Sequence, residues 1–171
     1  MRINWINELY SWIKGIASND YLLIVCMGTE LRCDDIVGLQ VCRILKEICD
    51  DVVRVVECPD GLELCIHEIT KYEPKYILII DGVLAGLKPG EAYFTCNIES
   101  LENFTPITTH HIPLNINIKY IKIIVPSIKS VCLLGIQVEC LDLGIKPSVK
   151  VMKSAKTIAL TLCDILRRYH F

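Results

Sequence analysis

The sequence lacks any apolar run of the roughly 18–20 residues that a transmembrane helix needs. Lys, Asp or Pro interrupts each of the longest candidates. It also lacks a basic excess: the formal net charge is −2, which gives no electrostatic case for nucleic-acid binding. Residues 1–19 carry charged side chains and no unbroken apolar centre, so they do not indicate a secretory signal. We therefore expect a cytoplasmic protein with no membrane span and no nucleic-acid partner.

Three motif classes are also missing. The ten cysteines include no Cys-x-x-Cys pair, the close spacing that structural zinc sites usually show. No Gly-x-Ser-x-Gly element marks a serine nucleophile, and Gly28 lacks the further glycines of a dinucleotide site. Cys33 is a poor candidate nucleophile, because the two acids beside it would raise the pKa of its thiol. Since most cysteines lie among apolar residues, we expect reduced thiols that act as small core residues.

Apolar residues, in contrast, are abundant. Hydrophobic residues make up 52% of the 171 positions, which favours a single domain with a large core. Large apolar residues from Trp5 to Ile16 recur at the spacing of one helix face. Residues 1–19 are therefore predicted to form an amphipathic helical extension that packs on the body of the domain. Residues 20–171 are predicted to form that body as a single α/β/α peptidase domain.

The order of apolar runs and helical periodicities predicts the fold class. Strands are predicted at residues 21–27, 52–56, 75–80, 92–96 and 131–138, and helices at 37–48, 62–69 and 148–169. The stretch 112–118 is ambiguous, because its alternation favours a strand whereas Pro113 near its start suits a helix. This order predicts a three-layer α/β/α sandwich with a mostly parallel sheet of about five strands, and we expect residues 92–96 at the sheet edge.

Acidic residues stand where two of these predicted strands end. Asp34 and Asp35 follow residues 21–27 after a short loop, and Asp81 follows residues 75–80. In open α/β sheets, ligands bind at the carboxyl ends of the strands. A later cluster, Thr108-Thr109-His110-His111, adds imidazole nitrogen, which together with carboxylate oxygen suits a nickel or zinc ion. Taken singly, Asp35 is as good a helix N-cap as a ligand, and His111 is nearly equal to His110 as a ligand candidate.

A family resemblance accompanies these residues. Motifs of the nickel–iron hydrogenase maturation proteases are similar, in the same order, to Gly28–Asp35, to Ile80–Val83 with Gly86 and Pro89–Glu91, and to Thr108–Asn115. The last of these resembles the histidine motif of the branch that serves hydrogenase-3-type enzymes. The family consists of endopeptidases that remove a short C-terminal tail from the hydrogenase large subunit after nickel insertion, and its fold is an α/β/α sandwich.

The resemblance implies specific roles. Asp35, Asp81 and His110 would contact nickel that the substrate carries and that the enzyme does not hold permanently. The expected activity is that of an aspartyl-type endopeptidase with Asp35 and Asp81 as catalytic residues, acting as a monomer on a nickel-loaded large-subunit precursor. Whether the metal or an acid activates the water is left open. Asp34 is expected to orient the loop or cap the following helix.

Two other functions stay open at this point. Because the sequence identifies no separate catalytic nucleophile, a non-catalytic nickel-checking or docking protein on the same fold is one alternative. A general peptidase or amidohydrolase with its own zinc is the other. We predict that Asp35, Asp81 and His110 converge at the C-terminal edge of the sheet.

Overall fold

The computed structural model describes residues 4–17, 20–98, 112–144 and 146–169. Its strands are β1 (Leu22–Met27), β2 (Arg54–Cys58), β3 (Tyr76–Val83), β4 (Ala92–Thr95) and β5 (Ser130–Gln137). Its helices are α1 (Trp5–Lys14), α2 (Val37–Ile48), α3 (Leu62–Thr70), α4 (Leu114–Ile124) and α5 (Val149–Tyr169). A short 3-10 helix, η1 (Cys33–Ile36), precedes α2.

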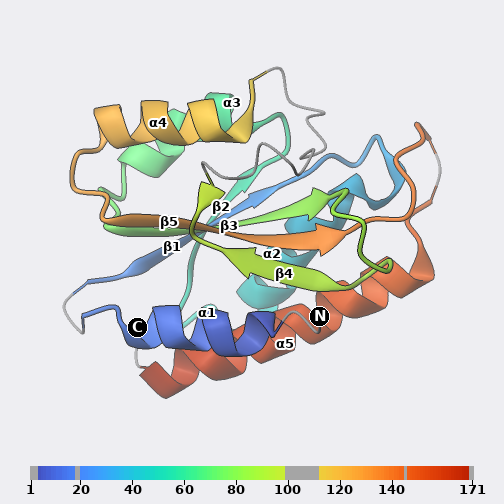
Figure 1. The fold of residues 1–171 in the computed structure, drawn as a ribbon, viewed down its shortest axis with the longest axis horizontal. Coiled ribbons are helices and arrows are strands. Elements are labelled where there is room, and N and C mark those ends of the chain that lie inside the picture. Colours follow the sequence, from blue (N-terminus) through green and yellow to red (C-terminus); the bar gives the residue numbers. More distant parts are fainter. Residues whose placement is uncertain (1–3, 18–19, 99–111, 145, 170–171) are drawn as a thin grey trace.

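The strands form one mostly parallel sheet in the order β2-β1-β3-β5-β4. Only β4 runs antiparallel to its neighbour among the described strands, and it lies at the edge beside β5. Helices α1, α2 and α5 cover one face of the sheet, and α3 and α4 cover the other (Figure 1). The predicted three-layer α/β/α sandwich and the edge position of residues 92–96 are thereby confirmed.

The central strands are apolar throughout because helices cover both of their faces. In β3, Leu78 and Ile80 enter the core beneath α2 and α5, whereas Ile77 and Ile79 enter the core beneath α3 and α4. Side chains alternate between the two faces of a strand. Asp81 therefore points to the same face as Ile79, the face covered by α3 and α4.

Helix α4 resolves the ambiguous stretch 112–118. Pro113 precedes its first residue, and Leu114, Ile118 and Ile121 form a buried stripe against the sheet. Their spacing of four and three residues matches the helical repeat, whereas the apparent strand alternation does not match burial, because Asn117 is buried and Ile116 is exposed. The stretch 112–118 is therefore helical from Leu114, because its apolar side chains pack against α3 and the sheet.

The N-terminal helix α1 packs on the same face of the sheet as α5. Leu9 and Ile13 are fully buried, and the Trp12 indole N–H donates to the Ser130 hydroxyl at 3.1 Å. Helix α1 thus packs through its apolar side. No helix in the described ranges is both long and apolar enough to cross a membrane.

The expectation of reduced cysteines is wrong for six of the ten. Disulfides join Cys26 with Cys42, Cys58 with Cys65, and Cys96 with Cys132. Each bond connects a strand, or the residue directly after one, to a neighbouring element. Such pairs depend on the tertiary arrangement and leave no close-spacing signal in the sequence. Four thiols remain free: Cys33, Cys49, Cys140 and Cys163.

Candidate active site

Asp35 is held at the C-terminal end of β1 by tight backbone packing. Gly28, the residue after the strand, has a φ of 138°, and its Cα lies so close to the backbone oxygen of Asp35 that a Cβ there would overlap it. The Asp35 N–H donates to the Arg32 carbonyl at 2.8 Å, which closes the turn into η1. The result is a carboxyl residue that is only 1% exposed.

Asp81 lies inside β3, which corrects the expectation that the strand ends at Ile80. The pairing with β5 continues through Asp81 and Gly82 to Val83. Aspartate and glycine are weak strand formers, so the apolar pattern predicts that the strand ends before them. The backbone pairing with β5 outweighs their low strand propensity. Asp81 is 4% exposed and lies near the C-terminal end of the strand.

The two acids influence each other electrostatically. Burial raises the pKa of Asp81 well above its ordinary value, and the negative charge of Asp35 raises it further, while the Gly82 N–H acts in the opposite direction. Two buried carboxyl groups, one in β3 and one in η1, thus lie within electrostatic reach of each other. Such a pair can share a proton or bind a cation, and a bound divalent ion would remove the repulsion between them.

The N-terminus of α2 holds this arrangement together. A Cβ at Gly38 would lie 2.5 Å from the Ile80 carbonyl oxygen, and it would overlap the Met27 carbonyl oxygen. The first turn of α2 therefore packs directly against the backbone of Met27 and Ile80, the residues that precede Gly28 and Asp81. This contact fixes the position of η1, which contains Asp35, relative to β3, which contains Asp81.

Asp34 has a structural role, as expected. Its fully buried carboxylate accepts the N–H groups of Glu139 and Cys140 at 2.9 and 3.0 Å. It also accepts the Ser148 N–H at 2.6 Å and the Ser148 hydroxyl at 2.9 Å. Asp34 thus ties the segment between β5 and α5 to the end of β1.

Asp34→Ala is expected to destabilise the fold by about 2–4 kcal/mol, because three backbone N–H groups and a hydroxyl lose a charged acceptor. Chemical denaturation followed by circular dichroism measures this difference. Asp142→Ala is the matched control, since Asp142 is an exposed acid of the same segment. An Asp34→Ala protein as stable as the control would contradict this role.

His110 and His111 lie outside the described residues, so the structure does not test the third predicted ligand. The chain is described again from Ile112, whose carbonyl accepts the Asn117 side-chain amide at 3.3 Å. The same amide donates to Glu63 at the start of α3, at 3.1 Å. The start of α4 therefore lies at the edge of the sheet where β1 and β3 end (Figure 1). Among the described residues, no three His, Cys, Asp or Glu side chains form a group suited to a metal ion.

Cys33 is unsuited to nucleophilic attack, and its burial is a stronger reason for this than the charge of the neighbouring acids. Burial is the main cause that raises the pKa of its thiol to about 12, followed by a hydrogen bond with Cys140 and then by the charge of Asp34. At neutral pH the group remains a thiol, and its sulfur lies 3.4 Å from the Lys146 carbonyl oxygen.

Tyr93 lies near Asp81, and Gln137 supports the loop after β3; the sequence predicted neither role. Burial raises the pKa of Tyr93 to about 12, with a further contribution from the charge of Asp81. Gln137 accepts the N–H groups of Ala85 and Leu87 at 2.8 and 3.0 Å, which holds the loop that follows β3. Tyr93 is part of an ordinary strand pattern, so only the pairing of strands reveals that it lies near Asp81.

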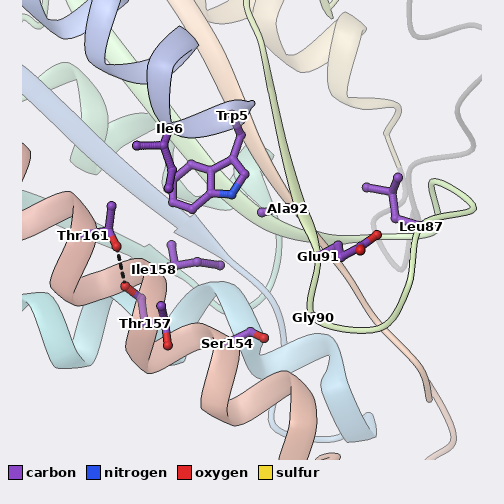
Figure 2. Close-up of a pocket in the computed structure, with 10 residues that line it drawn as sticks. All are labelled: Trp5, Ile6, Leu87, Gly90, Glu91, Ala92, Ser154, Thr157, Ile158 and Thr161. Carbon is purple, nitrogen blue, oxygen red and sulfur yellow. Dashed lines mark hydrogen bonds between the residues drawn. The ribbon is translucent and has the colours of Figure 1, made fainter. Parts of the chain in front are cut away.

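One cavity among the described residues is separate from the acids. It has a volume of about 390 Å³ and lies between α1, the start of β4 and α5. Figure 2 shows the Trp5 ring and the Ile158 side chain on opposite sides of it, with Glu91 near one end. Neither Asp35 nor Asp81 lines this cavity, so it is not a candidate for the chemistry at the strand ends.

Comparisons with known proteins agree with the fold. The family model of the hydrogenase maturation protease HycI matches residues 40–165, which include Asp81 and His110 and begin after Asp35. A Methanocaldococcus jannaschii protein assigned to the hydrogenase maturation proteases is 29% identical over 157 residues, covering 85% of this chain and 88% of its own length.

Two solved structures from Thermococcus kodakarensis are similar along nearly their whole length. The NiFe hydrogenase maturation protease HycI has a TM-score of 0.78 at 26% identity, with 94% of this chain and 99% of that chain covered. The maturation protease HybD has a TM-score of 0.68 at 25% identity, with 88% and 99% covered. Since the family model spans most of the sequence, the chain belongs to the hydrogenase maturation proteases, a family of endopeptidases.

Proposed function

We propose that this chain removes the C-terminal tail from the nickel-loaded large-subunit precursor of a nickel–iron hydrogenase. In this proposal Asp35, Asp81 and His110 contact the nickel that the precursor carries. The observation that supports it best is the pair of buried acids at the ends of β1 and β3, where the charge of Asp35 raises the pKa of Asp81. Two buried acids that interact electrostatically favour the binding of a cation, because a positive charge removes their repulsion.

The proposed chemistry follows from the position of the two acids. A metal ion held between the chain and its substrate would fix the scissile peptide beside Asp35 and Asp81, which lowers the entropic cost of attack. A carboxyl group beside the peptide can then accept a proton from the attacking water and donate that proton to the leaving amine. We propose that the cleavage takes place in the cytoplasm. In this proposal the enzyme is a monomer and does not retain the nickel after cleavage.

Intact-mass spectrometry of the precursor tests this function. Incubation with the chain is expected to shorten nickel-loaded precursor at its C-terminus and to leave nickel-free precursor unchanged. Asp50→Asn, which alters an exposed acid between the end of α2 and the start of β2, should cleave like the wild type. Loss of the tail from nickel-free precursor at the same rate would contradict nickel recognition.

The same assay separates the rival functions. A docking or nickel-checking protein would form a complex with the precursor without changing its mass. A peptidase with its own zinc would purify with about one zinc per chain by elemental analysis, whereas the proposed enzyme should purify largely free of metal.

A further inference from the structure

Asp81, Gly135 and Tyr93 form one lateral row across three neighbouring strands. Asp81 of β3 pairs with Gly135 of β5, and Gly135 pairs with Tyr93 of β4. Side chains in such a row project to the same face of the sheet. Asp81 and Tyr93 are two strand spacings apart, or about 10 Å between backbones, and the residue between them has no side chain.

The tyrosine ring occupies the space that Gly135 leaves open. A Cβ at Gly135 would lie 2.5 Å from Cε1 and 2.9 Å from Cζ of Tyr93, so the end of the ring that carries the hydroxyl lies over the glycine. Val83 borders the same space, with its Cγ1 3.0 Å from that Cβ position. The ring therefore reaches from the edge strand across β5 towards β3, and Tyr93 is only 7% exposed.

We propose that Tyr93 is a positioning residue for Asp81, whose carboxylate it orients towards the metal through its phenol. This inference rests on the proposed function. A phenol is a hydrogen-bond donor at neutral pH, and a donor beside a carboxylate fixes the orientation of its oxygens. Groups that orient a ligand in this way change metal affinity or activity by about 10–100-fold when they are removed.

Tyr93→Phe tests the proposal because it removes the hydroxyl and keeps the ring over Gly135. Isothermal titration of the isolated chain with Ni²⁺ alone is expected to show about 10–100-fold weaker binding, and precursor cleavage is expected to lose kcat by a similar factor with little change in KM. The melting temperature should change by no more than a few degrees. Tyr120→Phe, at an exposed position on α4, is the control and should bind Ni²⁺ like the wild type.

The outcomes distinguish this inference from the proposed function. Wild-type affinity for Ni²⁺ and wild-type kcat in Tyr93→Phe, together with loss of both in Asp81→Asn, would overturn the role of Tyr93 alone. A large fall in melting temperature with unchanged Ni²⁺ affinity would assign Tyr93 to packing and overturn it as well. A wild-type chain that neither binds Ni²⁺ nor cleaves the precursor would overturn the proposed function and this inference together.

Discussion

Asp81→Asn is expected to abolish cleavage of the precursor while making the folded chain more stable at neutral pH. The loss of activity should be about 10³-fold or more, because the variant removes one of two groups that act as a unit. The gain in stability should be about 0.5–2 kcal/mol, since a buried carboxylate beside a second acid is replaced by a neutral amide of the same shape. Opposite changes in activity and stability are typical of residues kept for function.

The stability gain should depend on pH in a defined direction. Burial and the charge of Asp35 raise the pKa of Asp81 in the folded state, so the folded chain holds a proton that the unfolded chain releases near pH 4. As pH rises from that value through the folded pKa, the wild type loses stability that the variant does not lose. The advantage of Asp81→Asn is therefore small at pH 4 and largest above the folded pKa.

Urea denaturation of both proteins across this pH range measures the difference. Asp60→Asn is the control for the chemical change, because Asp60 is exposed. A variant that is inactive and also less stable than the wild type at every pH would show that Asp81 supports the fold instead of straining it.

Gly38→Ala is expected to destabilise the chain by about 3–5 kcal/mol, a large part of the 5–15 kcal/mol that holds a typical domain together. The added Cβ would lie 2.5 Å from the Ile80 carbonyl oxygen and would overlap that of Met27. Both neighbours are backbone atoms, so no rotation of a side chain relieves the overlap. The start of α2 would have to lift away from the ends of β1 and β3.

Thermal melting followed by circular dichroism measures this effect. Gly15→Ala is a suitable control, because its φ is −78° and its Cβ would lie 3.3 Å from the nearest heavy atom. A Gly38→Ala protein that melts within a few degrees of the wild type would show that α2 does not rest on the strand ends as tightly as described.

The fold could be predicted largely from local patterns. Short apolar runs and helical stripes mark the strands and the α-helices other than α4 in order, and the three-layer arrangement follows from that order. The extension of β3 through Asp81 and Gly82 could not be predicted, because it depends on pairing with β5. The disulfides were missed for a related reason, since they depend on which elements lie side by side.

The candidate site was predicted in part. The rule that ligands bind at the carboxyl ends of parallel strands placed Asp35 and Asp81 at one edge, and the structure brings them within electrostatic reach of each other. The role of Tyr93 could not be predicted, because it depends on the register of β4 against β5 and on the gap at Gly135. His110 remains a prediction from the sequence.

Diffraction at the nickel absorption edge, from crystals of the chain soaked in Ni²⁺, tests the central claim most directly. The account predicts one nickel ion at the C-terminal edge of the sheet, bound by carboxylate oxygens of both Asp35 and Asp81 and by the imidazole of His110. A nickel ion bound by one acid without the other, or a site only at surface residues away from this edge, would contradict it.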